Sequence, residues 1–171
     1  MDREAFWKLI ESTRKKSGRD PDDQMDAIRD ALRKLAPDEI VSFDHHYTDL
    51  WADAYRWDVW QAAYVAGGGC SDDSFMDFRY WLIARGRKVY EAVLKDPEYL
   101  AKILEDGDEG QVEGFQYIAP EVWQEKTGLD RYTDFPERPD RLPTEPAGER
   151  RPDEQLPRRF PKLWKKFGDQ F

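Results

Sequence analysis

A turn at residues 67–73, GGGCSDD, gathers glycines, a thiol, a hydroxyl and two carboxylates in one short segment. Ser71 suits a helix N-cap, and Asp72 and Asp73 would occupy the first helical turn, where the helix dipole stabilises carboxylates. This pattern is typical of a well-capped corner between two helices. The same two carboxylates could instead act as acid/base groups or bind a cation. A phosphate site is disfavoured, because the carboxylates would repel the anion and no lysine follows as in a P-loop.

Arg79 and Cys70 complete the set of candidate catalytic residues near this turn. Arg79 lies nearly two helical turns beyond the aspartates, whereas good helical ion-pair partners lie three or four residues apart. We therefore expect it to pair with Asp58 of the preceding helix, with an anion clamp as the functional alternative. Cys70 precedes a helix N-terminus, which lowers the pKa of a thiol, but no histidine lies near it in sequence to complete a dyad. We expect a buried, unreactive thiol, as is common for a free cysteine.

Two tryptophans at helical spacing form the candidate ligand-binding group. Trp57 and Trp60 are three residues apart on one helical face, with Asp58 between them. Large aromatic residues placed in this way most often belong to a core. The alternative is the aromatic wall of a ligand site, in which Asp58 and Arg56 supply the polar groups and Trp81 supplies a further ring.

A weak metal-binding pattern precedes the tryptophans. His46, Asp49 and Asp53 share one helical face, and imidazole and carboxylate groups are both metal ligands. The spacing lacks the tight HExxH arrangement, and charged residues on such a face are commonly solvated. We therefore predict no bound metal and no cofactor, and keep these three residues as weak candidates.

The composition restricts the kind of protein that this chain can be. Aromatic residues make up 14% and charged residues 37% of the 171 residues, which fits one ordinary globular domain with a densely charged surface. The net charge of −9, concentrated in residues 1–128, argues against a nucleic-acid or anionic-membrane binder. The single cysteine and the lack of a signal-peptide pattern or a long apolar stretch predict a cytoplasmic protein.

Apolar spacing indicates helices throughout residues 1–128, and no segment alternates for long enough to suggest a strand. We predict an all-α fold, a compact bundle of six or seven helices, over this range. The longest is expected as one helix at 38–66, and the most apolar lies at 72–85. The remaining predicted helices are 2–17, a second one opened by Pro21, and shorter ones around 89–94, 96–104 and 119–128.

Residues 129–171 differ in kind from the rest of the chain. Most of the eleven prolines lie between residues 136 and 161, and proline keeps the backbone extended and removes a hydrogen-bond donor. We predict a proline-rich arm that ends in a short amphipathic helix at 160–167. That helix is expected to pack back on the helical domain, with docking on another protein as the alternative.

The central motifs carry a family resemblance. The segments GGGCSDDSF, FRYWLIARGR and DPEYLA, together with the opening FWKLIE, resemble the domain-of-unknown-function family 4240, a bacterial and mainly actinobacterial family. The resemblance covers at least residues 1–101 and implies a shared fold unit without an activity to transfer. It also implies that the family signature includes Cys70, Asp72, Asp73, Phe75, Arg79 and Trp81.

The residues favour a binding role over catalysis. No nucleophile–base pair, metal-ligand motif or cofactor loop occurs at convincing spacing, so we predict a non-enzymatic binding or interaction module. Its partner would be another protein or a small molecule, and neither a nucleic acid nor a membrane. One alternative is an enzyme with an acidic pocket between helices 38–66 and 72–85, in which Asp72 and Asp73 are acid/base groups or cation ligands and Arg79 is an anion clamp. The other is a small-molecule or peptide sensor with a tryptophan-lined cleft.

Overall fold

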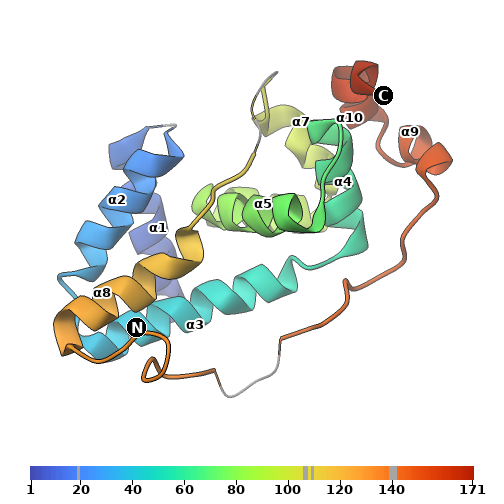
Figure 1. The fold of residues 1–171 in the computed structure, drawn as a ribbon. Coiled ribbons are helices and arrows are strands. Elements are labelled where there is room, and N and C mark those ends of the chain that lie inside the picture. The colour runs from blue at the N-terminus through green and yellow to red at the C-terminus, as the bar shows by residue number, and fades with distance from the viewer. Residues whose placement is uncertain (19, 106–107, 109, 139–141) are drawn as a thin grey trace.

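The computed structural model describes residues 1–171 except for 19, 106–107, 109 and 139–141 (Figure 1). In that part of the chain it contains helices and a single isolated β-bridge but no strand, so the predicted all-α class is confirmed. No helix in the described residues is long and apolar enough to cross a membrane. The α-helices are α1 (Arg3–Ser17), α2 (Pro21–Leu32), α3 (Pro37–Asp53), α4 (Trp57–Gly67), α5 (Asp72–Ala84), α6 (Arg87–Lys95), α7 (Leu100–Ile103), α8 (Ile118–Thr127), α9 (Leu156–Arg159) and α10 (Pro161–Phe167). Short 3-10 helices occupy Pro97–Tyr99, Phe115–Tyr117, Asp153–Gln155 and Gly168–Gln170.

The expectation of one long helix over residues 38–66 is wrong. The chain forms α3 and α4 with a break at residues 54–56, which gives eight α-helices within the described part of residues 1–128. Arg56 has extended backbone angles (φ −139°, ψ 141°) and forms an isolated parallel bridge with Ala147. The sequence at the break contains neither glycine nor proline, so the interruption depends on this tertiary pairing and has no local breaker signal.

Helix α5 lies in the middle of the molecule, between α1 and α2 on one side and α4 on the other (Figure 1). Its C-terminal half is buried on all sides, which agrees with the absence of a polar face between Phe78 and Ala84. Ser71 is its N-cap, as the sequence predicts, and the Ser71 hydroxyl accepts a hydrogen bond from the Ser74 amide at 3.1 Å. The glycine turn before it therefore marks the corner between α4 and the central helix.

The C-terminal segment (residues 129–171) runs past α3 and reaches the outer side of α4 (Figure 1). There the Trp57 amide donates to the Ala147 carbonyl at 3.0 Å, and the Ala147 amide donates to the Tyr55 carbonyl at 2.8 Å. Helix α10 then packs against α4, and Phe160 and Leu163 are fully buried. The end of the chain thus shares the hydrophobic core and forms a wall over α4.

Candidate functional site

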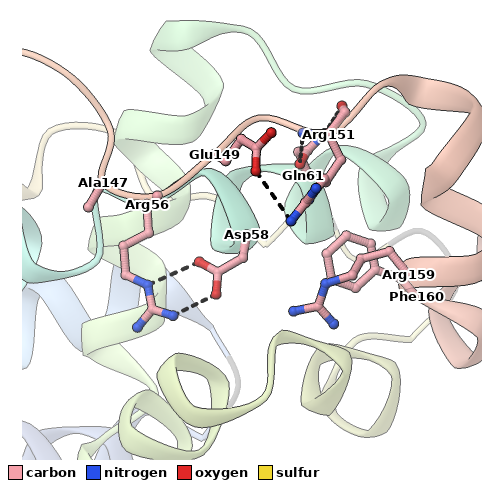
Figure 2. A pocket seen from close by; sticks show the side chains of 9 residues that line it. Arg56, Asp58, Gln61, Ala147, Glu149, Arg151, Arg159 and Phe160 are labelled. Atoms are coloured by element: carbon pink, nitrogen blue, oxygen red, sulfur yellow. Dashed lines mark hydrogen bonds and ion pairs between the residues drawn. The ribbon is translucent and has the colours of Figure 1, made fainter.

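Two cavities lie where the C-terminal segment covers the first turns of α4. The arginine cavity, 240 Å³ in volume, is lined by Arg56, Asp58, Gln61, Ala147, Gly148, Glu149, Arg151, Arg159 and Phe160 (Figure 2). The tryptophan cavity, 230 Å³ in volume, is lined by Trp57, Trp60, Gln61, Tyr64, Cys70, Arg150, Asp153 and Leu156. Because Gln61 lines both, the two cavities adjoin, and we refer to them together as the α4 site.

Gln61 fixes the C-terminal segment at this site. Its side-chain amide donates to the Arg151 carbonyl at 2.7 Å, and its oxygen accepts from the Arg151 amide at 3.0 Å. One side chain therefore satisfies both backbone groups of Arg151, as a neighbouring strand would. Gln61 is itself buried, and so the position of this wall is well defined.

The arginine cavity holds two ion pairs and a third guanidinium. Arg56 forms a two-pronged pair with Asp58, at 3.0 Å for Nε and 2.5 Å for Nη2, and also donates to the Leu94 carbonyl at 3.0 Å. Arg151 pairs with Glu149 at 3.3 Å. Figure 2 shows the Arg159 guanidinium turned inward beside Phe160, toward the Arg56–Asp58 pair.

Arg159 is the charged group of this cavity that lacks a counter-ion among the described residues. Its guanidinium lies over the Phe160 ring, 5.0 Å from the centroid, and forms no ion pair with a carboxylate in the described part of the chain. With Arg56 and Arg151 balanced by Asp58 and Glu149, the cavity carries one excess positive charge. That local charge is opposite to the net charge of the whole chain, which is −9.

The tryptophan cavity is built on a column of stacked rings. Trp57 stacks on Trp60 with 5.1 Å between ring centroids and 10° between ring planes, and Trp60 stacks on Phe75 at 4.7 Å and 11°. The Trp60 indole also donates to the Cys70 carbonyl at 3.0 Å. Phe75 is fully buried, whereas both indoles are partly exposed toward the cavity. The tryptophans thus continue the core and at the same time form a flat apolar wall.

The Cys70 thiol lies in this apolar wall. Burial raises the pKa of the Cys70 thiol to about 12, although the contact with Trp60 acts in the opposite direction. The thiol therefore stays protonated at neutral pH and is a poor nucleophile.

Asp72 and Asp73 lie apart from the α4 site. Both are exposed in the first turn of α5, and neither lines the arginine or the tryptophan cavity. The neighbouring Gly68 has φ +65°, and a Cβ there would collide with the Gln170 side chain. The glycine run therefore lets the last residues of the chain approach the α4–α5 corner closely.

The expected ion pair between Arg79 and Asp58 is wrong. The Arg79 guanidinium lies over the Trp51 ring, 3.5 Å from the centroid, and 4.4 Å from the Tyr55 centroid. It donates to the Trp51 carbonyl at 3.2 Å, while the Asp58 carboxylate is taken by Arg56. Burial lowers the pKa of Arg79 to about 10, so the guanidinium stays charged and is stabilised by aromatic faces and carbonyl groups.

The weak metal candidates each contact a different partner. The His46 ring nitrogen Nε2 lies 3.2 Å from the Met1 carbonyl oxygen. Asp49 pairs with Arg138, and Asp53 pairs with Arg3 at 3.8 Å. Among the described residues, no group of three or more histidine, cysteine, aspartate or glutamate side chains could hold a metal ion.

Sequence reasoning identified part of the α4 site. Trp57, Trp60 and Asp58 do lie around Gln61, whereas Trp81 lines a different cavity with Arg85, 670 Å³ in volume. Gln61 and the two arginines of the C-terminal segment, Arg151 and Arg159, were missed. Arg151 lies in irregular backbone and Arg159 ends the one-turn helix α9, and neither segment is long enough for periodicity to indicate which way a side chain points.

Comparison with known proteins identifies a family. No curated protein and no solved structure matches the chain. A family model described as "Protein of unknown function (DUF4240)" matches residues 1–125, which is well over half of the 171 residues and agrees with the resemblance carried by the central motifs. The residues of the C-terminal segment that line the α4 site fall outside the matched range. The chain belongs to the DUF4240 family of proteins of unknown function.

Proposed function

We propose that this protein is a non-enzymatic cytoplasmic binding module that holds a small anionic molecule with an apolar ring in the α4 site. The helical domain of residues 1–128 would supply the tryptophans and the Arg56–Asp58 pair. The C-terminal segment would close the site and supply Arg151 and Arg159. The observation that carries the proposal is the inward-facing Arg159 guanidinium, which lacks a carboxylate partner among the described residues.

The charges of the site favour an anion. A guanidinium binds a carboxylate or phosphate group through paired N–H donors, and such charge-assisted hydrogen bonds are about twice as strong as neutral ones. An anion beside Arg159 would balance the excess charge of the arginine cavity. An acidic protein surface elsewhere would not compete for that ligand, and the same acidity argues against a nucleic-acid partner.

The tryptophan cavity favours an apolar group attached to that anion. A ring placed against Trp57 would extend the column that already joins Trp57, Trp60 and Phe75. Each cavity is slightly smaller than typical ligand pockets of about 300–1,000 Å³, so a ligand that spans both fits better than one confined to either.

The chemistry of the site favours binding over catalysis. Its carboxylates Asp58 and Glu149 are held in ion pairs, and the Cys70 thiol is protonated at neutral pH. These groups provide fixed charges and apolar surface for a ligand. The paired carboxylates are weak bases and the protonated thiol is a poor nucleophile.

A calorimetric titration with phenylacetate tests the proposal. We expect saturable binding to the wild-type protein and about tenfold weaker binding to Arg159→Gln, the change that follows from losing one charge-assisted contact of about 1.4 kcal/mol. Arg158→Gln is the matched control, because Arg158 is exposed as Arg159 is but lines neither cavity. Phenylacetamide, which keeps the ring without the charge, should bind more weakly than phenylacetate.

Two results would overturn the proposal. One is equal affinity of phenylacetate for the wild-type protein and Arg159→Gln. The other is binding of the neutral amide as tight as that of the carboxylate, which would remove the role of the arginines.

A further inference from the structure

A third cavity, 290 Å³ in volume, is lined by residues of α3, α5 and the start of α8. Helices α3 and α8 lie on the opposite part of the molecule from α10 (Figure 1). None of its lining residues lines the α4 site. Its wall is rich in rings, contributed by Phe43, Tyr47, Trp51, Tyr80, Phe115 and Phe135. Several of these rings stack on one another, such as Tyr47 on Phe115 at 4.2 Å and Trp51 on Tyr80 at 5.7 Å. The cavity therefore has a rigid aromatic wall.

Asp44 is the one charged side chain among the described residues that line this cavity. It is largely buried and forms no hydrogen bond or ion pair with another described residue. The Arg138 guanidinium, whose charge acts on Asp44, is paired with Asp49 instead. A carboxylate in such a position is costly for the fold, because it has lost much of its hydration without gaining a partner among the described residues.

A second acceptor in the same cavity also lacks a partner. The Gln116 oxygen Oε1 is buried and accepts no hydrogen bond. Two donors of the aromatic wall point elsewhere: the Tyr47 hydroxyl donates to the Tyr80 carbonyl at 2.8 Å, and the Trp51 indole donates to the Met76 carbonyl at 3.3 Å. Buried polar atoms in native proteins are rarely left without a partner, so the Gln116 oxygen and the largely buried Asp44 carboxylate favour a donor that the described residues do not supply.

We infer that this cavity binds a small organic ammonium ion with an apolar body. The N–H groups of an ammonium ion would satisfy Asp44 and Gln116, and its charge would compensate the carboxylate. Its carbon skeleton would contact the rings, which also attract a cation. A calcium or magnesium ion fits poorly, since it requires about six or more oxygen ligands and the charged and amide groups here supply few. This inference is independent of the α4 site.

The inference carries a definite pH dependence. Burial raises the pKa of Asp44 to about 6, while His45 and Arg138 act in the opposite direction. Tyr80, the other titratable group that interacts with Asp44, has a pKa raised further above its usual range and stays neutral. Binding of an ammonium ion should therefore be strongest above about pH 7 and fall as Asp44 is protonated.

Calorimetry with phenethylammonium chloride and the full chain tests the inference. We expect saturable binding near pH 8 with a dissociation constant of about 1 mM or lower, and about tenfold weaker binding near pH 5. Asp44→Asn should abolish detectable binding at both pH values, and Gln116→Leu should weaken it severalfold. Asp38→Asn, an exposed aspartate on the same helix, is the matched control and should bind as the wild type does.

The neutral analogue 2-phenylethanol distinguishes charge recognition from simple filling of an apolar cavity. It should bind at least tenfold more weakly than the ammonium ion, the difference expected for one lost charged contact of about 1.4 kcal/mol. The inference is overturned if phenethylammonium produces no binding heat at about 10 mM. It is equally overturned if Asp44→Asn binds phenethylammonium as tightly as the wild type does, or if 2-phenylethanol binds as tightly as phenethylammonium.

Discussion

Replacing Asp44 with asparagine should stabilise the protein at neutral and alkaline pH. Burial raises the pKa of Asp44 from 3.8 to about 6, and the carboxylate has no hydrogen-bond or ion-pair partner among the described residues. Above about pH 6 the folded chain must therefore hold an uncompensated buried charge, which the unfolded chain exposes to water. Asparagine has nearly the same shape and carries no charge.

The size of the effect follows from the shift of the pKa. A difference of about two pKa units between the folded and unfolded states corresponds to about 3 kcal/mol of lost stability when the carboxyl is fully ionised. The asparagine amide would still lack a partner, at a cost of about 1 kcal/mol. The net gain for Asp44→Asn is then about 2 kcal/mol near pH 8, or a rise in Tm of about 4–8 °C for a chain of this length.

The sign of the pH dependence is fixed by the direction of the shift. Because the folded-state pKa is raised, Asp44 carries no penalty below about pH 3, where it is protonated in both states. The penalty grows as the pH rises from about 4 to about 6 and is constant above that range. The difference between Asp44→Asn and the wild type should change over the same window, from a loss of about 1 kcal/mol at its acid end to a gain of about 2 kcal/mol near pH 8.

Urea unfolding followed by circular dichroism, at a series of pH values, measures this difference directly. Subtracting the wild-type curve from that of Asp44→Asn cancels the other titrating groups, and Asp38→Asn on the exposed face of α3 should show no such window. A variant that is less stable than the wild type near pH 8, or a difference that does not change with pH, would refute the reasoning.

Two further predictions concern the attachment of the C-terminal segment. Gln61→Leu removes both hydrogen bonds to the Arg151 backbone. Amide hydrogen exchange at residues 147–151 should therefore accelerate at least tenfold, while exchange in α1 stays unchanged. Unaltered exchange at residues 147–151 would contradict the role of Gln61 in fixing the C-terminal segment. Phe160→Ala should lower the free energy of unfolding by about 3–5 kcal/mol in urea, because the ring is fully buried. Exposed Lys165→Ala should cost less than about 0.5 kcal/mol, and similar losses for both would show that the terminal helix does not share the core.

The helical parts of the fold were readable from the sequence where local signals and burial agree. The cap at Ser71 combines a favourable residue with carboxylates in the next turn, and the apolar run of α5 indicates a helix buried on most sides. The break between α3 and α4 was missed, because the bridge between Arg56 and Ala147 joins residues far apart in sequence. No local propensity marks such a pairing.

In the candidate site, too, the features with a local sequence signal were predicted, and those set by tertiary contacts were not. The spacing of Trp57 and Trp60 placed them on one face, and the structure shows that this face is both core and cavity wall. Arg79 was expected to pair with Asp58, but its guanidinium lies over the rings of Trp51 and Tyr55, which provide a cation–π environment. The sequence does not mark Asp44 as a site residue, since a single aspartate on a charged helix does not reveal that it is largely buried.

The most direct test of the α4 site is heteronuclear NMR of the tryptophan indole groups during a titration with phenylacetate. The proposal predicts saturable shifts of the Trp57 and Trp60 indole resonances, with the buried Trp7 of α1 unaffected as an internal control. The same shifts should require about tenfold more phenylacetate in Arg159→Gln. Shifts that spread equally to Trp7, or that are unchanged in Arg159→Gln, would contradict a site formed by the tryptophans and the arginine together.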